Sequence, residues 1–187
     1  HSLSGTSGSE ASRREAHLLP RRIYWLAVTL AVGACSSTPL TQAQRQQVYL
    51  SSVEGVGNEF SDVATITAEG LQEVMSRPES LVLIDVRSPE ERAVSMIPGA
   101  ISVEEFERNP EDGSDKLVVV YCTIGVRSSQ YAQAMAGKGV NVVNLEGSIL
   151  GWSYHGGPLV QGGEATKRLH VYGPSWDIAA EGYETVW

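Results

Sequence analysis

The chain has 187 residues with 42% hydrophobic side chains and a formal net charge of −8, which suits one globular domain with extensions and gives no electrostatic basis for binding nucleic acid. Its two cysteines, Cys35 and Cys122, are too few for a disulfide framework. Because the four histidines show no metal-ligand spacing and no Cys-x-x-Cys occurs, we expect no metal.

The N-terminal segment, residues 1–34, has the composition of an export signal. A region with four arginines precedes an uncharged apolar run over 23–34, which is short for a membrane span but suits a signal-peptide core. The run ends in Val32-Gly33-Ala34-Cys35, which resembles the lipobox of bacterial lipoproteins. The resemblance implies lipidation at Cys35 and a protein exported and lipid-anchored to a bacterial cell membrane, on its periplasmic or outer face. An ordinary cleaved signal or an uncleaved anchor, with Cys35 incidental, is the alternative.

Residues 35–64 are predicted to form a tether and an N-terminal extension. Ser36-Ser37-Thr38-Pro39 is typical of a flexible tether. A helix is expected near 42–50, and Gly55 and Gly57 are expected to break it, because glycine is a poor helix former.

The segment 65–156 is predicted to be the folded domain. Uninterrupted apolar runs are typical of strands buried on both faces of a sheet. Such runs, with one shorter strand, predict strands over 81–85, 100–103, 117–121 and 141–145.

Helices are predicted between these strands, and capping residues mark where they begin. Thr67 is an N-cap, and Ser88-Pro89-Glu90-Glu91 combines an N-cap, a first-turn proline and a capping-box glutamate. The predicted helices cover 68–76, a short segment after Ser88, 128–136 and 147–154. This alternation predicts an α/β fold with an open parallel sheet and helices on both faces. In such folds the reactive site lies at the carboxyl ends of the strands.

Cys122 follows the strand 117–121 and therefore lies at that edge of the sheet. A helix N-terminus and a nearby cation both lower the pKa of a thiol, and the following loop supplies both. Gly125 permits a positive φ, so consecutive N–H groups can form an anion cradle. The predicted cradle consists of Thr123, Ile124, Gly125, Val126, Arg127 and Ser128. The alternative is that Cys122 is a buried structural thiol.

The stretch 122–129, "CTIGVRSS", resembles the active loop of rhodanese-like sulfurtransferases, Cys-x-x-Gly-x-Arg-Ser. Three further stretches resemble segments of that family: "LIDVRSPEE" (83–91), "IPGAISV" (97–103) and "NLEGSILGW" (144–152). The resemblance covers 65–156 and implies the rhodanese-like fold. Two departures are Met96, where members often have histidine, and Ser148, where the family has a second glycine. We interpret both as tolerated variation, since these segments are mainly structural in the family.

The loop length separates sulfur chemistry from phosphorus chemistry. Cysteine-dependent phosphatases of related shape use Cys-x5-Arg, whereas four residues separate Cys122 from Arg127 here. The shorter loop predicts a cradle for a single sulfur atom. A phosphatase also needs a general acid, and Asp85 corresponds instead to a buried structural carboxylate of the rhodanese family.

The resemblance implies a two-step sulfur transfer through a Cys122 persulfide, with no cofactor. The implied partners are a small sulfur donor (thiosulfate, polysulfide or a persulfide) and a thiol or cyanide acceptor, with a protein thiol as a further possibility. A persulfide carrier without turnover, or an interaction module of the same fold, is the alternative.

Supporting roles are also predicted. Arg127 either contacts an anionic donor or pairs with a carboxylate, and we favour pairing. Asp85 and Arg87 are expected to be structural, with Arg87 paired to a carboxylate. Trp152 is expected to pack in the core.

The remaining segment, 157–187, is predicted to be an arm that packs on the domain. It is expected to bury Trp176, Tyr183 and Trp187. A second hypothesis places Lys167, Arg168 or His170 at the mouth of the active site.

Overall fold

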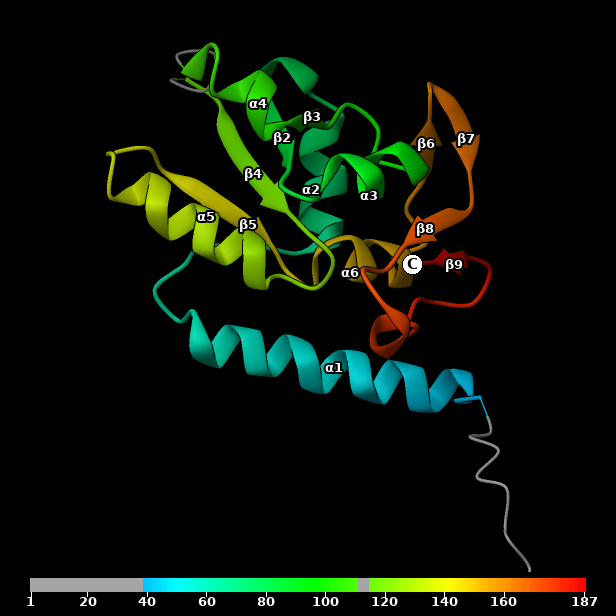
Figure 1. Ribbon diagram of the computed structural model, residues 1–187. Coiled ribbons are helices and arrows are strands. Elements are labelled where there is room, and N and C mark those ends of the chain that lie inside the picture. Colours follow the sequence, from blue (N-terminus) through cyan, green and yellow to red (C-terminus); the bar gives the residue numbers. More distant parts are fainter. Residues whose placement is uncertain (1–38, 111–114) are drawn as a thin grey trace, which may run out of the picture. The chain divides into compact units, whose positions relative to one another are not determined.

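The computed structural model describes residues 39–110 and 115–187, so the predicted signal peptide and Cys35 lie outside the described residues. Within these ranges the main sheet has five strands, all parallel, in the order β1-β5-β4-β2-β3 (Figure 1). The strands are β1 (Thr65–Ile66), β2 (Leu81–Asp85), β3 (Ile101–Ser102), β4 (Leu117–Tyr121) and β5 (Val142–Leu145). The predicted open parallel sheet is therefore confirmed.

The two central strands, β2 and β4, have the bounds that their apolar runs predict. They pair in parallel from Leu81 opposite Leu117 to Asp85 opposite Tyr121. Both strands consequently end at the same edge of the sheet. This register places the segment after Asp85 beside the segment that begins with Cys122.

Helices cover both faces of the sheet, as expected. They are α2 (Ala68–Met75), α3 (Pro89–Val94), α4 (Val103–Phe106), α5 (Val126–Ala136) and α6 (Ser148–Tyr154), with a 3-10 turn η1 (Pro78–Ser80) before β2. Alternate residues of β4 serve two cores: Val119 and Tyr121 pack with side chains of α2 and α6, whereas Val118 and Val120 pack with side chains of α4 and α5. Burial on both faces is why this strand is uninterruptedly apolar.

The helix α1 (Gln42–Glu59) corrects one prediction, because it continues through Gly55 and Gly57. Its side chains at Tyr49, Val53 and Val56 lie on one face and are partly buried. Two glycines cost a helix only about 1 kcal/mol each, and packing of this face against the domain offsets that cost. Tyr49 stacks on Tyr154 of α6 with ring centroids 4.4 Å apart.

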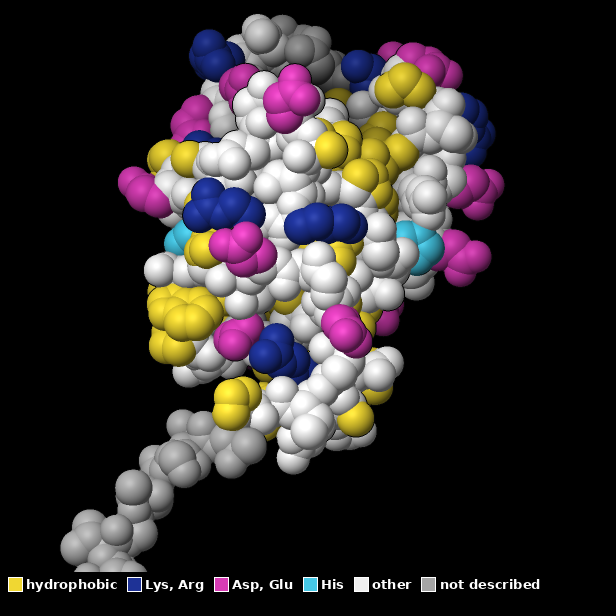
Figure 2. Space-filling view, turned by 90° about the vertical axis from the view of Figure 1, so that its right-hand side faces the viewer, with side chains coloured by type: hydrophobic (Ala, Val, Ile, Leu, Met, Phe, Trp, Pro, Cys, Tyr) yellow, Lys and Arg dark blue, Asp and Glu magenta, His cyan; other side chains and the backbone are white. Residues whose placement is uncertain are grey.

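The C-terminal segment forms short strands on the domain: β6 (Leu159–Gln161), β7 (Glu164–Thr166), β8 (Arg168–His170) and β9 (Glu184–Val186), with a 3-10 turn η3 (Pro174–Trp176). β6 and β7 make an antiparallel hairpin, and β8 pairs in parallel with β9. Figure 2 shows the side on which these strands lie, with acidic and basic side chains interspersed. Charge on this face is therefore locally balanced.

Candidate active site

Cys122 lies directly after β4 with 1% of its surface exposed, and its chain turns at once into α5. Gly125 holds a φ of 129°, a value that strains any residue with a side chain, and it caps the helix. The helix therefore begins at Val126 and not at the predicted Ser128. This earlier start places Arg127 and Ser128 in the first turn, where free N–H groups face the sulfur.

Three residues surround the Cys122 sulfur, Gly125, Ser128 and Ser148, and together with Cys122 they are called the floor. The Gly125 N–H donates to Cys122 Sγ at 3.2 Å, and the Ser128 hydroxyl donates to it at 3.4 Å. The Ser148 hydroxyl lies 3.9 Å from the same sulfur and accepts the Cys122 N–H at 3.1 Å. The floor is thus a set of donors that can stabilise a negative charge on sulfur.

These donors set the ionisation of Cys122. Burial by itself raises the pKa of the thiol. The Ser128 hydroxyl, the N–H groups of Ser128 and Gly125, and the positive charge of Arg127 together outweigh that effect and bring the pKa below the ordinary cysteine value. A larger fraction of the thiol is consequently in the nucleophilic thiolate form at neutral pH.

Ser148 lies closer to Cys122 than the sequence indicates. It is fully buried and has a φ of 50°. The next two N–H groups, of Ile149 and Leu150, donate to the carbonyls of Cys122 and Thr123, each at 3.2 Å. The start of α6 is thereby tied to the active loop. The residue that departs from the family glycine also lies 3.4 Å from the Ser128 hydroxyl, oxygen to oxygen.

Arg127 pairs with Glu91, which the sequence identifies as the capping-box residue of a helix. Its two terminal nitrogens donate to Glu91 Oε2 at 2.7 Å and Oε1 at 2.8 Å. The same carboxylate also caps α3 by accepting the Ser88 N–H at 2.9 Å. Burial raises the pKa of Glu91, but these bonds dominate and lower it to about 2. Of the two roles considered for Arg127, the structure contains the contact that the pairing role requires.

Asp85 and Arg87 form a fully buried ion pair, with Nη2 to Oδ2 at 2.6 Å. Arg87 also donates to the Ser95 carbonyl at 2.6 Å, which ties the end of β2 to the segment after α3. Neither residue lines the cavity in front of Cys122. Trp152 is likewise buried in the core, as expected.

A cavity of about 240 Å³ opens in front of Cys122. Besides residues of the loop, two aromatic side chains of the C-terminal segment line it, Tyr172 and Trp176, which are called the rim. The second hypothesis placed Lys167, Arg168 or His170 at this mouth, but none of the three is among the residues that line the cavity.

The expectation for the arm is corrected in a second respect, since Trp187 is 60% exposed. The aliphatic residues of the arm, which sequence reasoning did not single out, carry its burial instead. They are Leu159, Leu169, Val171, Ile178 and Ala179.

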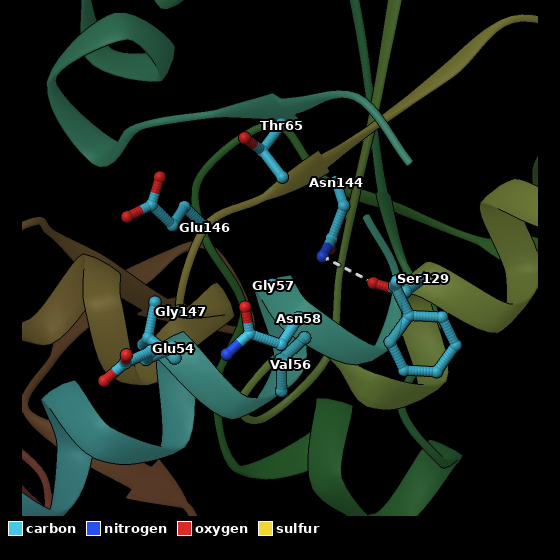
Figure 3. A pocket seen from close by; sticks show the side chains of 11 residues that line it. Glu54, Val56, Gly57, Asn58, Thr65, Ser129, Asn144, Glu146 and Gly147 are labelled. Atoms are coloured by element: carbon cyan, nitrogen blue, oxygen red, sulfur yellow. Dashed lines mark hydrogen bonds between the residues drawn. The ribbon is translucent and has the colours of Figure 1, made fainter. Parts of the chain in front are cut away.

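A second cavity, of about 340 Å³, is lined by α1, by Thr65 of β1, by Asn144 of β5 and by Ser129 of α5 (Figure 3). Asn144 projects toward it from β5 and donates to Ser129 Oγ at 2.9 Å. The same amide lies 3.4 Å from the Gly125 carbonyl, so Asn144 braces the turn from behind. Cys122 is not among the residues that line this second cavity. Cys122 therefore faces the smaller of these two cavities.

Within residues 39–110 and 115–187, no group of three or more His, Cys, Asp or Glu side chains is arranged to hold a metal ion. In the same part of the chain, no helix has both the length and the apolar character needed to cross a membrane.

Comparison with known proteins gives the family. Residues 67–155 match the rhodanese-like domain. A sulfurtransferase of Allochromatium vinosum is 36% identical over 102 residues, which are 52% of this chain and 95% of that protein. A thiosulfate:glutathione sulfurtransferase of Saccharomyces cerevisiae is 26% identical over 57% of this chain and 90% of its own length. The chain belongs to the rhodanese family.

One solved structure supports the fold. The crystal structure of a thiosulfate sulfurtransferase from Pseudomonas aeruginosa superposes with a TM-score of 0.51 at 24% identity. The similarity covers 64% of this chain and 26% of that one. This likeness concerns the fold of the domain.

Proposed function

We propose that the protein is a sulfurtransferase that moves sulfane sulfur from a small donor to a thiophilic acceptor through a persulfide on Cys122. The observation that carries the proposal is the floor, where a buried sulfur with a lowered pKa accepts hydrogen bonds from Gly125 and Ser128. The names of the sulfurtransferase relatives support the same class of reaction.

In the first step, the Cys122 thiolate attacks the outer sulfur of the donor. The donor's S–S bond breaks, and its electron pair leaves with the departing group, which is sulfite when the donor is thiosulfate. In the second step, an acceptor such as cyanide takes the outer sulfur and returns the thiolate. The floor stabilises the negative charge on sulfur in both steps, and the order is ping-pong.

Turnover with thiosulfate and cyanide tests this proposal. We expect the purified protein to form thiocyanate, and we expect Cys122→Ser to form none while keeping the circular dichroism spectrum of the wild type. Mass spectrometry after donor alone should find one added sulfur atom in the wild type only. If neither thiocyanate nor a persulfide forms with any donor, the proposal is wrong.

A persulfide carrier without turnover is distinguished by the same experiment. A carrier would gain one sulfur atom from the donor and would not pass it to cyanide or to small thiols. Thiocyanate formation at catalytic rates favours the enzyme, because a carrier needs its own partner to release the sulfur.

We also propose that the protein is exported and anchored by lipid on Cys35, a proposal supported by the sequence Val32-Gly33-Ala34-Cys35 alone. Labelling of expressing bacteria with palmitate should mark the wild type and leave Cys35→Ala unmarked. Equal labelling of the two proteins, or no labelling of either, would contradict lipidation.

A further inference from the structure

The rim comes from a part of the chain outside the rhodanese match. The cavity in front of Cys122 is lined by five loop residues and by Tyr172 and Trp176. The match ends at residue 155, so both aromatic side chains belong to the C-terminal segment. The segment that follows the rhodanese-like domain therefore forms one wall of the cavity in front of Cys122.

The segment that carries the rim is firmly attached to the domain. Val171 and Ile178, which lie on either side of the rim in sequence, are 0% and 2% exposed. The Tyr154 hydroxyl of α6 donates to the Ile178 carbonyl at 2.8 Å, and the Ala180 N–H donates to Ser153 Oγ at 3.1 Å. The aromatic wall is thus already in place before any ligand binds.

Tyr172 has a backbone conformation that a bulky side chain seldom adopts. Its φ is 69°, and its N–H donates to His170 Nδ1 at 3.1 Å. Such a conformation costs about 1–3 kcal/mol and persists where neighbouring structure enforces it, typically at functional sites. Here it holds the ring 5.0 Å from the Arg127 guanidinium, centroid to carbon, with 64% of the residue exposed.

The cavity offers little positive charge to a bound sulfur donor. Arg127 is the one cationic side chain among the lining residues, and both of its terminal nitrogens are bonded to Glu91. Most of the remaining lining is apolar: Ile124, Val126, Tyr172 and Trp176. A doubly charged donor therefore gains little from the cavity, whereas an apolar group gains contact with two aromatic rings.

We propose that the site prefers sulfane-sulfur donors whose leaving group carries an alkyl or aryl substituent, namely organic persulfides and thiosulfonates, over inorganic thiosulfate. This inference rests on the proposed function and names its substrate class. In the reaction, the Cys122 thiolate attacks the terminal sulfur of the donor and forms the new S–S bond. The old S–S bond breaks, and its electron pair leaves on a sulfinate from a thiosulfonate or on a thiolate from a persulfide.

Three donors that deliver the same sulfur atom test the preference: benzenethiosulfonate, methanethiosulfonate and thiosulfate, each with cyanide as acceptor. The first two share one charge and differ in the apolar group. We expect Trp176→Ala and Tyr172→Ala to lower the ratio of kcat/KM for the phenyl donor over the methyl donor by about tenfold, as expected for lost aromatic contact. Comparing each variant with the wild type cancels the intrinsic reactivity of the donors.

Two control variants isolate the rim. Tyr172→Phe keeps the ring and should keep the wild-type ratio. Trp187→Ala removes an exposed aromatic residue of the same segment that does not line the cavity, and it should leave all three rates unchanged.

The outcomes separate this inference from the proposed function. A wild type that uses thiosulfate at least as well as benzenethiosulfonate, or a phenyl-to-methyl ratio that is unchanged in both alanine variants, overturns the substrate preference and leaves sulfur transfer standing. Failure of all three donors to load Cys122 overturns both. A reduced ratio in both alanine variants, with the controls unchanged, supports the preference.

Discussion

The floor and the rim of the active site differ in origin, burial and chemistry. The floor consists of donors within the segment 67–155 that matches the family, and its four residues are all buried. The rim consists of aromatic side chains from the C-terminal segment, and Tyr172 is largely exposed. Hydrogen-bond donors stabilise a negative charge most strongly where water is excluded. An apolar wall can contact a ligand while it faces the solvent. The difference teaches that the shared domain sets the reactivity of the sulfur and the added segment sets which molecules reach it.

Arg127 lies between the two regions, one residue before Ser128 of the floor and 5.0 Å from the Tyr172 ring of the rim. Breaking its ion pair with Glu91 should therefore have the largest effect. In Glu91→Gln the guanidinium loses its charged partner, and α3 loses part of its cap. We expect the free energy of unfolding to fall by about 2 kcal/mol, less than for a fully buried pair because Arg127 is partly exposed. Chemical denaturation at pH 7 measures the change.

A matched control for this variant is Glu104→Gln, which breaks the exposed pair with Arg92 at 3.2 Å. It should change stability little, because exposed ion pairs contribute little. Equal stability of the wild type and Glu91→Gln would show that the Arg127–Glu91 ion pair does not stabilise the fold.

The same pair predicts a dependence of stability on pH. The pKa of Glu91 is lowered from 4.5 to about 2 in the folded protein, so its stabilising contribution is fully present above pH 4.5 and is lost as the pH falls toward 2. The difference in unfolding free energy between wild type and Glu91→Gln should therefore shrink from pH 5 to pH 2. A difference that stays constant over this range would refute the assignment.

A smaller effect is expected within the floor, from Ser148→Gly, which restores the family residue. The Ser148 hydroxyl lies 3.4 Å from the Ser128 hydroxyl and can orient the Ser128 proton toward the Cys122 sulfur. The glycine variant lacks this neighbour. The pKa of Cys122 should rise, and its alkylation by iodoacetamide at neutral pH should slow by about threefold. The pH profile of alkylation separates this role from a merely structural one.

Ser95→Ala serves as the control for that experiment. The Ser95 hydroxyl is buried and has no hydrogen-bond partner within the described ranges 39–110 and 115–187. Removing the Ser95 hydroxyl should leave the pH profile of Cys122 alkylation unchanged. A profile of Ser148→Gly identical to that of the wild type would show that Ser148 only fills space.

The smallest of these effects concerns the backbone of Tyr172 and the stability of the fold. Tyr172→Gly and Tyr172→Ala both lack the ring, but only glycine tolerates a φ of 69° without strain. The glycine variant should be more stable than the alanine variant by about 0.5 kcal/mol, because relief of about 1–2 kcal/mol of left-handed strain is partly offset by the entropy of glycine in the unfolded chain. An alanine variant at least as stable would argue that the backbone is not strained.

The central strands of the sheet could be predicted from sequence because they are buried on both faces, whereas the two-residue edge strand β1 was not predicted. β4 is apolar throughout and β2 is apolar up to its last residue, Asp85, and the observed bounds of both strands are those predicted. The predictions for α1 and α5 failed where local propensity was overruled. Packing of Val53 and Val56 carries α1 through two glycines. The left-handed Gly125 starts α5 two residues early.

The position of Cys122 and its loop could be predicted, but the residues that reach the loop from other parts of the chain could not. Cys122, Gly125, Arg127 and Ser128 lie in one short stretch, where spacing carries information. Glu91 lies 36 residues from Arg127. The sequence identified Glu91 as a capping-box residue and did not indicate its pairing with Arg127. The hydrogen bond from the Ser88 N–H nevertheless holds the Glu91 carboxylate in the position where Arg127 binds it. For Ser148, 26 residues from Cys122, the departure from the family glycine was the available indication.

The sequence by itself determined the parallel sheet, the position of Cys122 at a strand end and the loop that surrounds its sulfur, because each depends on neighbours along the chain. Only the tertiary structure decided what contacts that loop. It brought Glu91 to Arg127, placed Ser148 beneath the sulfur, and selected Tyr172 and Trp176 as the wall of the cavity. Such contacts depend on how distant segments pack, and neither apolar periodicity nor helix caps encode that packing locally.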